Sequence, residues 1–233
     1  MTEETLIASA RLHNQFPPDT SFPQIDVLSE GFEELCAIIA KYNAQSRFRL
    51  RLLHRHTTIP EGQILLGTSI TEPPGFWTRP TPISDVDLQN IHPHIISVDD
   101  EARNGRLFPS EFREGPPASD WSIESGFFTE FTDYLRVKGW ENIFGLEIMQ
   151  GQTGKMIEFS FDIGSLLLEE AEVSGQFESQ ETAWTIRVRD GAVDKDGETR
   201  CVIIQGQHLR ATKMLVKSVS DVLKVLRDEG VLL

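Results

Sequence analysis

The sequence predicts an α+β fold with a largely antiparallel sheet and three main helices, and two observations carry this prediction. Apolar residues at helical spacing mark helices at about 29–43, 122–138 and 219–229. The remaining segments alternate apolar and polar residues, without the regular strand and helix alternation or the glycine-rich turns of a parallel sheet. We expect a single domain over 1–233, because each half has only one or two helices to cover its strands.

Each predicted helix has end signals. Ser29 is the N-cap of the first helix, and Gly139 ends the second. The third begins at Ser218, with Asp221 three residues on as a capping box, and it ends at Gly230. These signals set four of the six helix boundaries.

Proline separates the two halves of the chain. All 12 prolines lie between Pro17 and Pro117. We therefore expect an irregular N-terminal arm at about 1–28 and a Pro-rich loop region at about 71–120. The expected strands are 47–56, 63–70, 91–98, 142–149, 155–163, 165–173, 182–189 and 199–208. Pro93 cannot donate to a ladder, so its strand is placed at a sheet edge, and 190–198 is interpreted as a polar hairpin loop.

The segment 47–56 alternates with period two. One face carries Phe48, Leu50, Leu52, His54 and His56. The other carries Arg47, Arg49, Arg51 and Arg55. We expect the apolar set to be buried and Arg49 and Arg51 to be exposed, in surface ion pairs with Asp99, Asp100 and Glu101. Glu158 and Asp162 are likewise interpreted as solvated acids of an outward strand face.

The candidate catalytic residues are His54 and His56. Residues two apart on a strand point the same way, so both imidazoles can face one cavity and divide acid and base roles. His92 and His94 form a second pair with the same spacing. Trp77, in a proline-stiffened loop, and Arg49 are the candidate ligand-binding residues.

The spacing H-x-H-x4-E from His54 to Glu61, followed by Gly67, resembles the first motif of the cupins. That resemblance implies a divalent metal held by both histidines and Glu61. Phe48 stands where the cupin motif has a glycine. The second cupin motif places a further histidine after a Pro-x-Gly turn, and no histidine of this sequence has that context. We therefore expect no bound metal and no cofactor.

Two stretches, RLRLLHRH and the later KMIEFSFDIGSLLL, resemble uncharacterised proteins of filamentous fungi. This resemblance implies a eukaryotic intracellular protein. It assigns no function to any residue.

Charge excludes some partners. Acidic residues outnumber basic ones by 36 to 22, a net charge of −14, which opposes binding to nucleic acid and to anionic membranes. No apolar stretch approaches the roughly 20 residues of a membrane-spanning helix, and Glu3 and Glu4 argue against a secretory signal. Cys36 and Cys201 are expected to be reduced, so the expected location is cytoplasmic. The oligomeric state is left open.

Three functional interpretations remain. The first is a small-molecule enzyme or ligand-binding protein with cofactor-free proton transfer, as in an isomerase, cyclase or lyase, near His54 and His56. The alternative is a non-catalytic, acidic protein-interaction module. The third is a cupin-like metal-dependent enzyme.

Overall fold

The computed structural model describes residues 1–18, 25–99, 106–116, 125–149, 154–175, 177–204, 207–208 and 217–232. The helices are α1 (Glu3–Gln15), α2 (Glu30–Lys41), α3 (Phe127–Lys138) and α4 (Val219–Asp228). The strands are β1 (Phe48–Leu52), β2 (Gln63–Thr71), β3 (Pro74–Pro82), β4 (Ile91–Val98), β5 (Leu107–Glu114), β6 (Phe144–Ile148), β7 (Met156–Phe161), β8 (Gly164–Glu169), β9 (Ser179–Arg189), β10 (Ala192–Ile204) and β11 (Gln207–His208).

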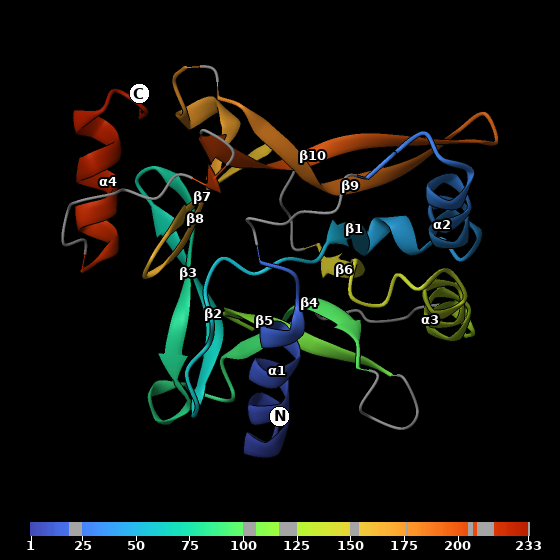
Figure 1. Ribbon diagram of the computed structural model, residues 1–233, viewed down its shortest axis with the longest axis horizontal. Coiled ribbons are helices and arrows are strands. Elements are labelled where there is room, and N and C mark those ends of the chain that lie inside the picture. Colours follow the sequence, from blue (N-terminus) through green and yellow to red (C-terminus); the bar gives the residue numbers. More distant parts are fainter. Residues whose placement is uncertain are drawn as a thin grey trace.

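Ten strands close into a β-barrel with mixed strand directions (Figure 1). The order around the barrel is β10-β7-β8-β3-β2-β5-β4-β6-β1-β9, and the pairing of β9 with β10 closes the ring. Two neighbouring pairs are parallel, β10 with β7 and β2 with β5. Each of the ten strands therefore has one face toward a common interior and one face toward the outside.

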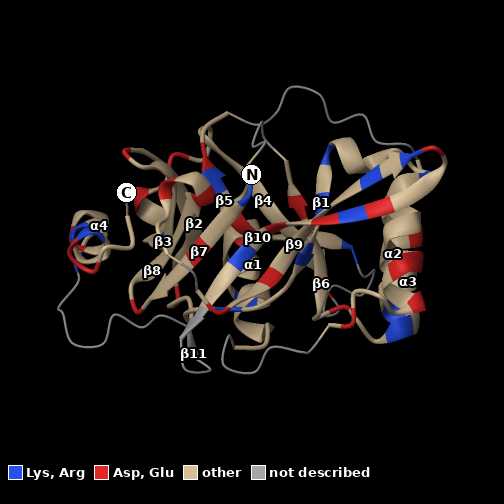
Figure 2. Ribbon diagram, turned by 90° about the horizontal axis from the view of Figure 1, so that it is seen from above, with Lys and Arg blue, Asp and Glu red and all other residues tan. Residues whose placement is uncertain are grey.

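The helices pack on the outside of the barrel. Figure 2 shows α2 and α3 at one end of the molecule and α4 at the other. Aromatic residues fill the layer between the barrel and the helices α2 and α3: Phe32, Phe48, Phe127, Phe131, Phe144 and Trp184. The layer under α4 contains Phe159, Phe161, Leu166 and Leu226. Among the described residues, no helix is long and apolar enough to cross a membrane.

The predicted α+β fold with a largely antiparallel sheet is wrong, because the strands form a closed mixed barrel and the helices are short. Strand β10 begins at Ala192, so most of the expected loop at 190–198 belongs to a strand. The expected edge strand with Pro93 is β4, which has neighbours on both sides. It pairs with β6 only at Ile95 and Ile96, so the missing N–H of Pro93 interrupts no ladder there.

Two regions expected to be irregular contain helices or strands among their described residues. The arm at 1–28 contains α1, which packs against β2 and β5. Thr2 caps this helix by accepting a hydrogen bond from the Thr5 N–H at 3.3 Å. The Pro-rich region at 71–120 contains β3, β4 and β5. The predicted caps of α2 and α4 are confirmed: Ser29 and Ser218 each accept a hydrogen bond from a backbone N–H. Of the predicted helix at 122–138, residues 122–124 lie outside the described part.

Strand β1 is buried on both faces. Phe48, Leu50 and Leu52 pack under α2 and α3, as predicted. Arg49 and Arg51 are not exposed, contrary to the prediction, but only 2% and 7% accessible. Arg51 reaches Glu158 of β7, which is not a neighbour of β1 in the sheet, so the contact crosses the barrel interior. The second face of β1 therefore lines the inside of the barrel.

Candidate functional site

His54 and His56 lie just after β1, in a segment fastened to the end of α1. The Arg55 N–H donates to the Pro17 carbonyl oxygen, and its guanidinium donates to that of Phe16, both at 2.9 Å. The Asn14 side chain makes two hydrogen bonds with the backbone of Ile59, at 2.8 and 2.9 Å. These contacts hold the two imidazoles against the barrel interior.

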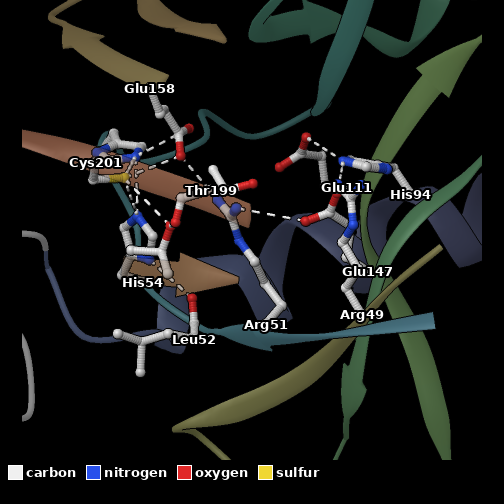
Figure 3. Close-up of polar contacts among 12 residues, drawn as sticks. Arg49, Arg51, Leu52, His54, His94, Glu111, Glu147, Glu158, Thr199 and Cys201 are labelled. Atoms are coloured by element: carbon white, nitrogen blue, oxygen red, sulfur yellow. Dashed lines mark hydrogen bonds and ion pairs between the residues drawn. The ribbon is translucent and has the colours of Figure 1, made fainter. Parts of the chain in front are cut away.

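Glu158 of β7 and Cys201 of β10 complete a cluster with His54 and His56, called the tetrad below (Figure 3). Each residue offers one metal-ligand atom, and all four atoms lie within 4.8 Å of one another. The two histidine Nε2 atoms are 3.1 Å apart, and Cys201 Sγ is 3.4 and 3.9 Å from them. Glu158 reaches Cys201 at 3.1 Å and His56 at 3.2 Å. Three distant segments thus converge on one point.

Hydrogen bonds fix how the tetrad atoms point. His54 Nδ1 lies 3.0 Å from the Leu52 carbonyl oxygen, which can only accept. The proton of a neutral His54 therefore sits on Nδ1, and its Nε2 presents a lone pair to the cluster. A second hydrogen bond of this kind typically orients a metal-binding histidine.

The electrostatics of the tetrad follow from its burial. Burial, together with the nearby His56 and Arg51, lowers the pKa of His54 well below its usual value, so it is neutral. Burial opposes ionisation of Glu158, but His56 and Arg51 outweigh it and hold the pKa of Glu158 well below its usual range. Burial and the Glu158 carboxylate raise the pKa of the Cys201 thiol to about 11. The metal-free tetrad therefore contains a carboxylate and a protonated thiol.

Arg51 connects the tetrad to a second buried group, the interior network of Arg49, Arg51, Arg113, His94, Glu111 and Glu147. Figure 3 shows Arg51 between the two groups. It contacts Glu158 at 2.9 Å and Glu147 at 3.6 Å, and Glu147 also lies 3.6 Å from Arg49. Arg113 is buried with its guanidinium 3.7 Å from the centre of the Phe76 ring. Buried charges of both signs thus offset one another inside the barrel.

Glu111 is an acid of this network whose ionisation is disfavoured by its surroundings. Burial raises its pKa to about 7, Glu158 adds to the effect, and Arg51 opposes it. Between about pH 4.5 and 7 the folded state therefore binds more protons at Glu111 than the unfolded state does, so stability falls as pH rises through this window.

We expect Glu111→Gln to remove this loss. The variant should exceed the wild type in unfolding free energy by up to about 3 kcal/mol at pH 8 and differ little at pH 4.5, since one pKa unit corresponds to about 1.4 kcal/mol. Urea unfolding of the metal-free proteins at both pH values measures this. Glu114→Gln, an exposed position on the same strand, is the control. A Glu111→Gln effect of equal size at both pH values would contradict the assignment.

A cavity of about 30 Å³ adjoins the tetrad. His54, His56 and Glu158 line it, together with His13 and Phe16 from the α1 end. Its volume corresponds to about one water molecule, whereas pockets for drug-sized ligands measure about 300–1,000 Å³. His54 and His56 do face a cavity, as expected. Their catalytic role stays a prediction.

The other sequence-predicted residues lie elsewhere. Trp77 is on β3 rather than in a loop, and it packs under α4 with Phe161, not at the cavity. Arg49 lies in the interior network instead of a ligand site. Glu61 is exposed before β2 and is not part of the tetrad. His92 is not part of the tetrad. Its Nδ1 lies 2.8 Å from the Gly115 carbonyl oxygen instead.

Sequence reasoning missed two of the four tetrad residues. Glu158 was expected to be solvated but is only 7% exposed, whereas Asp162 is exposed in the following turn. Cys201 was recognised as a buried thiol, and it is free, as is Cys36 under α2. Of the expected partners of the arginine face, Asp99 pairs with Arg11 at 3.5 Å, and 100–101 lie outside the described residues. A polar residue alternating with Ile157 and Phe159 was the available signal for an inward Glu158.

The chain matches no protein-family model, no curated protein sequence and no solved structure at a significant level.

Proposed function

We propose that this chain is a metal-binding protein whose β-barrel holds one zinc-type divalent ion at the tetrad of His54, His56, Glu158 and Cys201. The observation that carries the proposal is the convergence of two imidazole nitrogens, a thiol and a carboxylate at 3.1–3.9 Å. A tetrahedral zinc site has bonds of about 2.0–2.3 Å, which place its ligand atoms roughly 3.3–3.8 Å apart. All four ligand atoms of the tetrad lie within 4.8 Å of one another, so shifts of up to about 1 Å would bring them to this geometry.

Charge balance also supports a divalent ion. Glu158 is already ionised, and a bound metal would deprotonate the Cys201 thiol, as metals do to coordinating thiols. The two negative charges would then neutralise the ion, and Arg51 would keep its contact with Glu158. A reducing compartment, which the two free thiols favour, would keep Cys201 available.

This proposal departs from the sequence-based expectation of no metal. That expectation rested on the departures from the cupin motif, in which Glu61 would be the third ligand. Glu158 and Cys201 supply the third and fourth ligands from strands more than 100 residues away in the chain. The cavity volume also weighs against a substrate pocket of ordinary size beside His54 and His56.

The test is metal binding by the purified, chelator-treated protein. We expect one equivalent of Zn²⁺ to bind with proton release, measured by calorimetry in buffers of different ionisation enthalpy and by elemental analysis. Cys201→Ala should weaken binding at least about 100-fold, because loss of a direct ligand should exceed the roughly 10–100-fold cost of losing a supporting hydrogen bond. Co²⁺ should show a thiolate charge-transfer absorption in the wild type that this variant lacks.

The matched control is Cys36→Ala, which removes the other buried thiol from a layer of apolar side chains under α2. It should leave the stoichiometry and affinity for Zn²⁺ unchanged. Equal affinities of the two cysteine variants, or a wild type without a stoichiometric site, would refute the proposal.

A second function uses the same atoms without a metal. His56 Nε2 lies 3.1 Å from His54 Nε2 and 3.2 Å from Glu158 Oε1, so one proton on this nitrogen can be passed to either neighbour. An enzymatic activity that persists in the metal-free wild type but is lost in the metal-free His56→Ala variant would favour this proton-transfer function.

A further inference from the structure

The cavity beside the tetrad has walls of two different kinds. His54, His56 and Glu158 of the tetrad form part of its lining, and His13 and Phe16 at the end of α1 form another part. Leu12 and Phe16 anchor that end of the helix by packing with Leu53 and Ile95. A volume of about 30 Å³ leaves room for one small group in this space.

His13 faces this space from α1. His13 is only 4% exposed. Its Nε2 atom has no hydrogen-bond partner among the described residues. A backbone hydrogen bond with Thr57 raises the pKa of His13 but does not offset the effect of burial. Burial and the nearby His56 lower the pKa of His13 to about 4, so the imidazole is neutral near pH 7. An unsatisfied buried nitrogen is costly, and a protic group in the cavity would satisfy it.

We propose that the tetrad metal carries one exchangeable ligand, water or hydroxide, which occupies the cavity and donates a hydrogen bond to His13 Nε2. This inference rests on the proposed metal centre and adds an open coordination position to it. A zinc site with four protein ligands is normally closed and structural, whereas sites that bind or activate small molecules keep an open position. The added ligand would therefore make the ion at the tetrad five-coordinate. The cavity has room for about one water molecule, so only a small and narrow ligand can replace the water.

The probe is azide added to the Co²⁺-loaded protein, with the visible absorption of Co²⁺ as readout and elemental analysis to verify that the metal stays bound. Azide should saturably change the wild-type spectrum, and the larger imidazole should not. Neutral His13 favours water over azide, because azide has no proton to donate. His13→Leu and His13→Phe should therefore bind azide about three- to tenfold more tightly than the wild type, the equivalent of one hydrogen bond.

The matched control is His92→Phe, at a buried histidine that does not line the cavity, and its azide affinity should equal that of the wild type. A fully loaded protein whose Co²⁺ spectrum ignores azide would show a closed four-ligand site. That result would overturn this inference and leave the metal centre standing. Unchanged azide affinity in both His13 variants would remove His13 from the site. Failure of Co²⁺ and Zn²⁺ to bind at all would instead refute the metal proposal.

Discussion

Glu147→Gln should lower the unfolding free energy of the metal-free protein by about 3–5 kcal/mol. Glu147 is 2% exposed and lies between Arg49 and Arg51, each at 3.6 Å, with His94 at 4.0 Å. The amide keeps the volume of the side chain but removes its charge, so the two guanidinium groups lose a shared counter-charge inside the barrel. Removing one partner of a buried ion pair typically costs this much, because the remaining charge stays desolvated.

The control for this prediction is Glu130→Gln on α3. Glu130 contacts Lys41 at 2.6 Å, which is closer than either contact of Glu147, but both side chains are partly exposed. Surface ion pairs contribute about 0–1 kcal/mol, so this variant should differ little from the wild type. Urea unfolding of the three proteins gives the comparison. If both variants lose the same unfolding free energy, or if the variant with the shorter ion pair loses more, burial does not determine the contribution of the interior network.

The alternation in β1 could be recognised from the sequence, but its meaning could not. The pattern correctly separates Phe48, Leu50 and Leu52 from Arg49 and Arg51. In an open sheet under one layer of helices, the arginine face would be solvated. In a closed barrel that face turns inward, where acids from β6 and β7 pair with it. Such pairs join residues about 100 positions apart, which local periodicity does not reveal, so the barrel was missed together with the partners of the arginines.

The N-terminal helix was missed for a different reason. Its signals are present: Thr2 at the cap, acids at Glu3 and Glu4, and buried Leu6, Ala10 and His13 at helical spacing. Because Pro17 and Pro18 follow the helix, the whole segment at about 1–28 was predicted to be an irregular arm. This error concealed the part of the cavity lining that comes from α1. The histidine pair itself was predictable, because two imidazoles two residues apart are unusual beside an apolar strand.

The glycine in the hairpin between β7 and β8 should tolerate an alanine poorly. Gly164 lies in this hairpin with a φ of 152° and lines the cavity. A Cβ atom placed on it would overlap the carbonyl oxygen of Thr78 in the neighbouring β3. That oxygen belongs to rigid backbone of the barrel wall, so it has little freedom to move. We expect Gly164→Ala to lower the unfolding free energy by about 2–5 kcal/mol, from overpacking of about 1–3 kcal/mol together with the cost of the positive φ.

Gly139→Ala separates the two causes, because Gly139 ends α3 with a φ of 68° and a Cβ there meets nothing within 4 Å. It carries the cost of positive φ alone, about 1–2 kcal/mol. Chemical unfolding of both variants should therefore show a difference of at least about 1 kcal/mol that belongs to the contact between β8 and β3. Equal losses would mean that the barrel wall yields at Thr78. The walls of the cavity would then be able to adapt to ligands larger than its volume of about 30 Å³ suggests.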